Sequence, residues 1–278
     1  MSSLGEEGFF SILLEQQRAY QLHHKGDFKA MQKPERDLNG KVAVVTGAGR
    51  GIGKAVAIAF AQAGAAVACA ARTAAEVEAT AKEIQTNGGR GIALPTDVRN
   101  LASVQQMFKK AVEEFGGLDI VFINAGVHEA RKLLAESDPE DWRTTIEVNL
   151  IGAYHCARTA IPYLQQRGGG KIITMGSGNG HRGKPRGSAY SCSKAGLWML
   201  TRVLAPELWP HNISVNELIP GPVTTAMNPD KPGQPGTSVA ESEWLKMPED
   251  VVPLALFLAT QPQVGPTAQS FSLMRRDA

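Results

Sequence analysis

A glycine-rich turn between an apolar strand and a helix constrains this chain more than any other feature. Residues 42–45 are apolar and mostly β-branched, which predicts a buried strand, and residues 46–53 (TGAGRGIG) follow directly. The next stretch has helical spacing and ends near Gly64, after which residues 67–70 form a second apolar run. These segments predict a strand–helix–strand unit.

Glycines at such a turn let backbone N–H groups approach a pyrophosphate at the positive end of the following helix. The spacing here is G-x-x-x-G-x-G, not the commoner G-x-G-x-x-G, and a glycine turn without a ligand would have the same composition. The turn therefore predicts a dinucleotide site only if residues elsewhere in the chain support it.

Strands and helices continue to alternate along the rest of the chain. The further predicted strands are residues 91–95, 118–123, 171–175, 213–218 and 270–273. The further predicted helices are residues 74–86, 101–115, 138–164, 189–207 and 249–259. This alternation is typical of an α/β fold with a doubly wound parallel sheet, the Rossmann type.

The amino-acid composition does not change along the chain and there are no internal repeats, which predicts a single domain over residues 38–278. Residues 1–37 precede the first strand and form an N-terminal extension. This extension is expected to be either a loose tether or a helix, over about residues 6–22, that docks on a neighbouring subunit.

Composition excludes several functional classes. The 278 residues carry a formal charge of only +2 with both signs interspersed, so neither nucleic acid nor an anionic membrane is an expected partner. Cys69, Cys156 and Cys192 are dispersed, which favours a reducing compartment, and we expect a cytoplasmic protein. No apolar run reaches membrane-spanning length, and no His/Cys/Asp cluster predicts a metal site.

Candidate catalytic residues follow the predicted strand 171–175, where ligands of such sheets bind. Ser177 comes two residues after this strand, and Tyr190 and Lys194 lie four residues apart on one face of the next predicted helix. A nearby ammonium should lower the tyrosine pKa from about 10 and make the phenol a usable acid or base. A serine hydroxyl can stabilise a developing alkoxide. Taken alone, the Tyr–Lys pair could also be an accidental surface pair.

With these motifs in place, the chain resembles the short-chain dehydrogenase/reductase family over about residues 38–265. Five motifs match in order: residues 46–53, Asp97-Val98, Asn124-Ala125-Gly126, the set Asn149, Ser177, Tyr190 and Lys194, and residues 220–225. The resemblance implies hydride transfer between a nicotinamide and a carbonyl or alcohol carbon.

The resemblance also implies roles for individual residues. Tyr190 would exchange the proton, Ser177 would polarise the carbonyl, and Lys194 would tune Tyr190 and bind ribose hydroxyls. Asn149 would hold a water in a proton relay, although a helix-interior amide can also bond only to backbone. The implied cofactor-binding residues are Gly47, Arg50, Gly51, Ile52, Gly53, Arg72, Asp97, Val98, Asn124, Ala125, Gly126, Tyr190, Lys194, Pro220, Gly221, Val223 and Thr225.

Cofactor preference depends on the end of the second strand. An acidic residue there would bind the ribose 2′-OH of NAD, but this chain has Ala71 followed by Arg72, and Arg50 lies in the glycine turn. Two guanidiniums suit a 2′-phosphate, so NADP(H) is expected in preference to NAD(H).

The sequence identifies the substrate least well. The expected pocket residues are His128, Asn179, His181 and Met227, and the basic run 181–186 is either a solvated loop or a contact for an anionic substrate. The prediction is an NADP(H)-dependent carbonyl reductase or alcohol dehydrogenase, assembled as a homodimer or homotetramer through the helices near 140–165 and 189–207. The alternatives are a 3-oxoacyl-carrier-protein reductase and a non-catalytic NADP(H)-sensing protein.

Overall fold

The computed structural model describes residues 37–129, 131–228, 243 and 245–274. All of the described residues belong to one compact unit, which begins at Asp37. The predicted extension, including its helix over residues 6–22, lies outside the described residues.

The core of the unit is a sheet of seven parallel strands in the order β3-β2-β1-β4-β5-β6-β7. The strands are β1 (Val42–Thr46), β2 (Ala66–Ala71), β3 (Arg90–Pro95), β4 (Ile120–Ile123), β5 (Gly170–Met175), β6 (Ile213–Ile219) and β7 (Ser270–Ser272). The chain winds outward from β1 in one direction and, from β4, in the other, so the predicted doubly wound sheet is confirmed. This reversal at β1 and β4 creates a crevice at the carboxyl ends of the strands.

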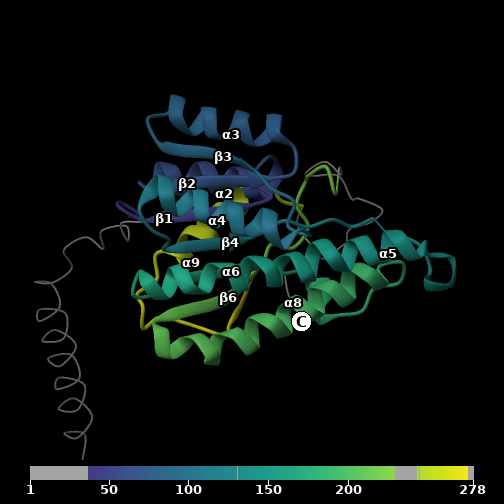
Figure 1. Cartoon of the computed structure of the whole chain (residues 1–278). Helices are drawn as coiled ribbons and strands as arrows, with labels where there is room; N and C mark the ends of the chain where they lie inside the picture. Colours follow the sequence, from purple (N-terminus) through teal and green to yellow (C-terminus); the bar gives the residue numbers. More distant parts are fainter. Residues whose placement is uncertain (1–36, 130, 229–242, 244, 275–278) are drawn as a thin grey trace, which may run out of the picture. The chain divides into compact units, whose positions relative to one another are not determined.

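Helices cover both faces of the sheet (Figure 1). One face packs against α4 (Leu101–Phe115), α6 (Gly152–Gln166) and α8 (Ser188–Leu208). The other packs against α2 (Gly51–Gln62), α3 (Ala74–Thr86) and α9 (Val252–Ala259). Each helix packs apolar side chains against the sheet, and most residues of the central strands are apolar and buried. The strand β6 also buries the polar residues Ser214, Asn216 and Glu217. None of the helices in the described part of the chain is both long and apolar enough to cross a membrane.

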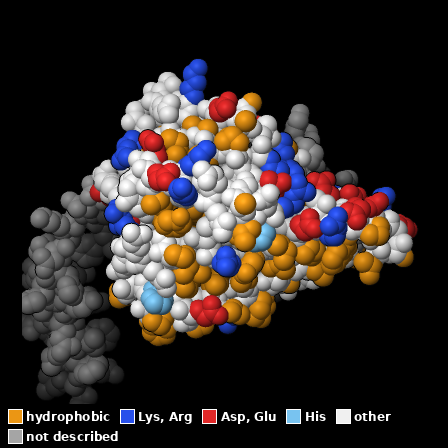
Figure 2. All heavy atoms as spheres, viewed as in Figure 1, with side chains coloured by type: hydrophobic (Ala, Val, Ile, Leu, Met, Phe, Trp, Pro, Cys, Tyr) orange, Lys and Arg blue, Asp and Glu red, His pale blue; other side chains and the backbone are white. Residues whose placement is uncertain are grey.

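Hydrophobic side chains also gather on the outer surface over α6 and α8 (Figure 2). The large exposed hydrophobic residues of these two helices are Tyr154, Met199 and Val203. Such a contiguous apolar surface is typical of an interaction site.

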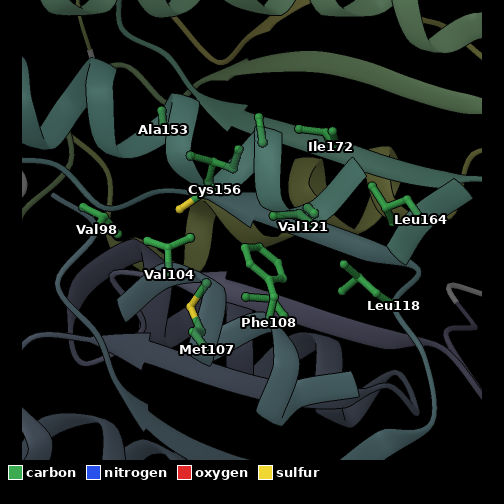
Figure 3. Packing of buried hydrophobic residues seen from close by; sticks show 14 of the residues in the cluster. Val98, Val104, Met107, Phe108, Leu118, Val121, Ala153, Cys156, Leu164 and Ile172 are labelled. Carbon is green, nitrogen blue, oxygen red and sulfur yellow. The ribbon is translucent and has the colours of Figure 1, made fainter. Parts of the chain in front are cut away.

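The interior between α4, α6 and the sheet is closely packed (Figure 3). Val104 and Phe108 of α4 and Cys156 of α6 belong to one buried cluster with Val121 of β4, and none of the four is exposed. This packing holds the strands rigid, so that the loops at their carboxyl ends have a fixed base.

Two local features differ from the predicted elements. The helix expected over residues 138–164 is interrupted: α5 (Pro139–Ile146) leads into a π-helical turn (Glu147–Ile151) before α6 begins. The start at Pro139 follows from the Asp138 side chain, which accepts hydrogen bonds from two backbone N–H groups of the first turn. A short helix that was not predicted, α7 (Gly178–His181), follows β5.

Candidate active site

A cleft of about 640 Å³ opens at the carboxyl ends of the strands. Its volume is in the range of small-molecule sites. The predicted site residues that line it are Gly47, Arg50, Gly51, Ile52, Arg72, Asp97, Val98, Asn124, Ala125, Gly126, His128, Ser177, Asn179, Tyr190, Lys194, Pro220, Gly221, Val223, Thr225 and Met227. Three others, Gly53, Asn149 and His181, are not among the lining residues.

Two glycines of the turn, Gly47 and Gly53, have no room for a side chain. Gly47 has a φ of +67°, and a Cβ there would lie 2.7 Å from the amide nitrogen of Asn124. A Cβ on Gly53 would lie 2.2 Å from the Gly47 carbonyl oxygen. Gly53 therefore lets α2 pack against the turn, while Gly51, the first residue of α2, lies on the cleft wall. This bare backbone at a helix N-terminus fits a pyrophosphate.

Thr46 and Asn124 join the turn after β1 to the loop after β4. The Thr46 hydroxyl accepts hydrogen bonds from the backbone N–H groups of Asn124 (2.9 Å) and Ala125 (3.0 Å). The Asn124 amide donates in return to the Thr46 carbonyl, at 2.9 Å. The two loops are thus held together at the floor of the cleft.

Charged side chains surround the end of the cleft near β2 and β3. The Arg99 guanidinium bonds to the Asp97 carboxylate and holds the Asp97 pKa below its ordinary value, and the charge of Arg72 acts in the same direction. Asn100, not Asp97, caps α4, because its side chain accepts from the Ser103 N–H. Asp97 therefore lines the cleft with its carboxylate paired to Arg99.

Glu76, in the first turn of α3, was missed by the sequence analysis. Its carboxylate lines the cleft and lies 3.5 Å from the Arg50 guanidinium. This carboxylate therefore offsets the charge of Arg50, one of the two guanidiniums on which the expected preference for NADP(H) depends. Glu76 reaches the turn because Gly49 has no side chain: a Cβ there would lie 2.8 Å from a Glu76 carboxylate oxygen.

Tyr190 and Lys194 lie on one face of α8, as predicted. The Lys194 ammonium is 5.7 Å from the centre of the Tyr190 ring and donates a 2.7 Å hydrogen bond to the Met175 carbonyl at the end of β5. Burial lowers the pKa of Lys194 to about 8, and the charge of Glu217 opposes this fall. The Met175 carbonyl thus orients a partly destabilised cation beside the phenol.

The expected fall in the Tyr190 pKa is not found. Burial raises this pKa, and a hydrogen bond with Ser177 and the charge of Arg131 oppose the rise without cancelling it. Desolvation of the phenolate outweighs the nearby charges here. Tyr190 is therefore a neutral phenol at neutral pH.

Ser177 is presented to Tyr190 by the start of α7. Its hydroxyl caps this helix by accepting the Asn179 N–H at 3.2 Å. Ser177 also acts on Tyr190 through its side chain and opposes the rise of the Tyr190 pKa. A hydroxyl and a phenol consequently converge on one point of the cleft, which is the arrangement needed to bind and protonate a carbonyl oxygen.

Asn149 lies behind the cleft, in the π-helical turn, and is 1 % exposed. Its side-chain oxygen accepts the Val127 N–H at 2.8 Å, and its amide donates to the Val127 carbonyl (2.9 Å) and to the Ser193 hydroxyl (3.0 Å). Ser193 in turn donates to the Tyr190 carbonyl at 2.7 Å. Asn149 thus connects the loop after β4 to α8. It lies in a π-helical turn, and such turns are frequent at functional sites.

The remaining predicted pocket residues lie in two places. His128 is stacked on Tyr190 in the cleft, whereas His181 is not among the lining residues and bonds to Glu217 of β6 at 2.9 Å. Arg131, after β4, donates to the Met227 carbonyl, after β6, and so bridges two loops of the cleft. Arg182 and Lys184 line the same cleft, so its wall is basic near the phenol.

Comparison with known proteins points to one family. Residues 41–235 match the family described as short chain dehydrogenase. A short-chain dehydrogenase/reductase of Armillaria gallica is 40 % identical over 247 residues, covering 84 % of this chain and 94 % of the relative. A 3-oxoacyl-[acyl-carrier-protein] reductase of Synechocystis is 34 % identical over 238 residues, covering 85 % of this chain and 96 % of the relative.

A solved structure is similar over the same region. The crystal structure of a dehydrogenase/reductase from Sinorhizobium meliloti superposes with a TM-score of 0.78 at 35 % identity. The match covers 86 % of this chain and 95 % of that one. The similarity therefore extends across nearly the whole length of the two relatives and of the solved structure, and across about 85 % of this chain.

Proposed function

The chain belongs to the short-chain dehydrogenase/reductase family, and from this premise we propose that it interconverts a carbonyl group and a secondary alcohol with NADP(H). Members of this family are oxidoreductases that use a nicotinamide cofactor. The observation that carries the proposal is the convergence of Tyr190, Ser177 and Lys194 in a cleft whose other wall is the glycine turn.

When held in this cleft, a nicotinamide would supply or accept the hydride. Tyr190 gives a proton to the substrate oxygen during reduction, and its raised pKa keeps it in the protonated form that this step requires. Ser177 donates a hydrogen bond to the same oxygen and stabilises the charge that develops there. Lys194 stabilises the phenolate left behind, because a cation beside an anion favours the charged form.

The preference for NADP(H) is supported by charge at the adenosine end of the cleft. Arg50 and Arg72 both line it, and Ala71 leaves no carboxylate at the position that would bind a ribose 2′-OH. Glu76 partly offsets Arg50. We infer that Arg72 provides the main contact to the 2′-phosphate.

A screen of cofactor oxidation tests the function directly. Purified protein is mixed with NADPH or NADH and a panel of ketones, quinones, sugars and β-ketoacyl thioesters, and loss of the reduced cofactor is followed by absorbance. We expect turnover of at least one carbonyl class, faster with NADPH. Cofactor binding without turnover of any substrate would favour the alternative, an NADP(H)-sensing protein.

A second candidate activity is reduction of a 3-oxoacyl group on a carrier protein. It is supported by the name of the Synechocystis relative and by the basic residues Arg131, Arg182 and Lys184 that line the cleft. Such residues suit a substrate carried on a negatively charged partner. Faster reduction of a carrier-bound β-ketoacyl thioester than of free ketones in the screen would select this activity.

We also propose that the chain forms a homo-oligomer through α6 and α8. The exposed apolar surface over these helices, which includes Tyr154, Met199 and Val203, suits burial against a second copy (Figure 2). Light scattering after size-exclusion chromatography should give a dimer or tetramer, and Met199→Glu with Val203→Glu should give a monomer.

Three free cysteines favour a cytoplasmic location.

A further inference from the structure

Glu217 places a carboxylate inside the sheet layer, behind the proposed catalytic residues. It lies on β6 and is 0 % exposed. One of its oxygens accepts hydrogen bonds from His181 Nε2 (2.9 Å) and from the Ser270 hydroxyl of β7 (2.5 Å). The other oxygen, Oε1, has no hydrogen-bond partner among the described residues. Burying a carboxylate in this way is costly unless a nearby cation compensates its charge.

The unpartnered oxygen points toward the peptide that also binds Lys194. A Cβ on Gly176 would lie only 2.0 Å from Glu217 Oε1, so this oxygen occupies the space beside the Gly176 backbone. Lys194 is also buried, with 3 % of the residue exposed. Its ammonium donates to the carbonyl of Met175, the residue before Gly176. A buried carboxylate and a buried ammonium therefore flank the single peptide unit that joins Met175 to Gly176.

The same carboxylate holds α7 in place. His181, the last residue of α7, reaches Glu217, and its ring packs on Trp198 of α8 with centroids 5.0 Å apart. Ser177 caps the other end of this short helix. The position of the Ser177 hydroxyl thus depends on a hydrogen-bond partner that lies 36 residues away from His181 in the chain.

From this arrangement we propose that Glu217 is a positioning residue: its carboxylate keeps Lys194 charged and, through His181, fixes the helix that presents Ser177. The proposal rests on the proposed function only for its kinetic consequences, since the electrostatic coupling exists in the free protein. The titratable groups that act on Lys194 are Tyr190 on its own helix and Glu217 from β6. His181 from α7 bonds to Glu217, and Arg131 acts on Tyr190.

The sign of the effect follows from the charges. Burial favours the neutral amine of Lys194, and Glu217 favours the ammonium. If the carboxylate is replaced by an amide, the pKa of Lys194 falls further, and the lysine loses its charge at a lower pH. The proposed enzyme needs the charged form, so its activity should decline at a lower pH as well.

The test compares Glu217→Gln with the parent protein by two measurements. In the cofactor-free protein, the carbon-13 resonance of the Lys194 side chain, assigned as the peak that Lys194→Arg removes, is titrated with pH. Its midpoint should lie near 8 in the parent and lower by about one pH unit or more in Glu217→Gln. The basic limb of the kcat/KM profile for the best carbonyl substrate should move in the same direction by a similar amount.

Ser270→Ala is the matched control, because it removes a hydrogen bond to the same carboxylate but leaves the charge. Its Lys194 midpoint and basic limb should remain at the parent values. Glu217→Asp retains the charge but moves it away by one methylene. It should lower the Lys194 midpoint and the basic limb of the kcat/KM profile by less than Glu217→Gln does. Glu217→Asp takes the place of Glu217→Gln if the latter does not fold.

An unchanged Lys194 midpoint in Glu217→Gln, or in Glu217→Asp when only that variant folds, overturns the proposal. An equal shift in Ser270→Ala would also overturn it, because the effect would then be due to packing and not to charge. A parent protein that reduces no carbonyl refutes the proposed function but leaves the resonance titration valid, so the two failures are distinguishable.

Discussion

The imidazole of His128 stacks on the phenol ring of Tyr190, with centroids 4.4 Å apart and ring planes inclined by 24°. The contact joins the loop after β4 to α8. Burial lowers the pKa of His128 to about 4, and the charges of Arg131 and Lys184 act in the same direction. The ring beside the proposed proton donor is therefore neutral at neutral pH and restricts the phenol without adding charge.

The depressed His128 pKa makes folding stability depend on pH. In the unfolded chain the imidazole binds a proton below about pH 6.5, but in the folded protein it binds one only near pH 4. Its contribution is therefore complete above about 6.5 and is lost as the pH falls toward 4. His128→Phe keeps a stacked ring without this titration.

Urea unfolding of both proteins at pH 7.5 and pH 5 measures the effect. The parent should lose about 1 kcal/mol more stability between these two pH values than His128→Phe does, after allowance for partial exposure of the ring. Equal losses in the two proteins would show that His128 titrates normally.

Tyr190→Phe should abolish most of the activity while leaving cofactor binding intact. Removing a general acid lowers rates by about a thousandfold, and the phenyl ring can still stack on His128. Steady-state kinetics with the best carbonyl substrate gives the rate, and NADPH fluorescence titration gives the affinity. If more than a tenth of the parent kcat remained, Tyr190 would not be the proton donor.

Arg72→Ala should weaken NADPH selectively. We expect its KM to rise by roughly tenfold, as for the loss of one charge-assisted contact to phosphate, with NADH unchanged. Arg90→Ala, which removes the same charge at the start of β3 outside the cleft lining, should leave both values at the parent level. Parallel changes for NADPH and NADH would contradict a 2′-phosphate contact.

Glu76→Gln should improve the use of NADPH. The substitution frees Arg50 and removes a negative charge from the cleft, so the NADPH KM should fall by about threefold at low salt, the scale of an exposed ion pair, and by less at high salt. Glu83→Gln is the control, since Glu83 lies on the same helix and pairs with Lys54 outside the cleft lining. A rise in the NADPH KM of Glu76→Gln would refute this role.

Asn149→Ala should cost stability as well as activity. It leaves the N–H and the carbonyl of Val127 without their side-chain partner, at a cost of about 2 kcal/mol. Asn100→Ala removes the exposed cap of α4 and should cost about 1 kcal/mol without changing kcat. Denaturant unfolding and steady-state kinetics of both variants check this; loss of activity in Asn149→Ala at full stability would favour a purely catalytic role.

Local patterns were enough to predict most of the fold. The helices predicted over residues 74–86 and 101–115 agree with α3 and α4. Their apolar spacing lies within each helix, and the residues that end a helix lie directly beside it, as Asn100 and Gly116 do for α4. The π-helical turn was not predictable in this way. Its Asn149 bonds to Val127, a residue of another loop, and no local pattern encodes that contact.

By itself, the sequence determined the parallel doubly wound sheet, the glycine turn, and the pairing of Tyr190 with Lys194 on one helical face, because each depends on spacing along a short stretch of chain. Tertiary structure alone decided which polar groups meet: Glu76 with Arg50, and Glu217 with His181. It also decided that burial outweighs the nearby cations at Tyr190. Proximity and desolvation are properties of the packed molecule, so residue spacing cannot specify them.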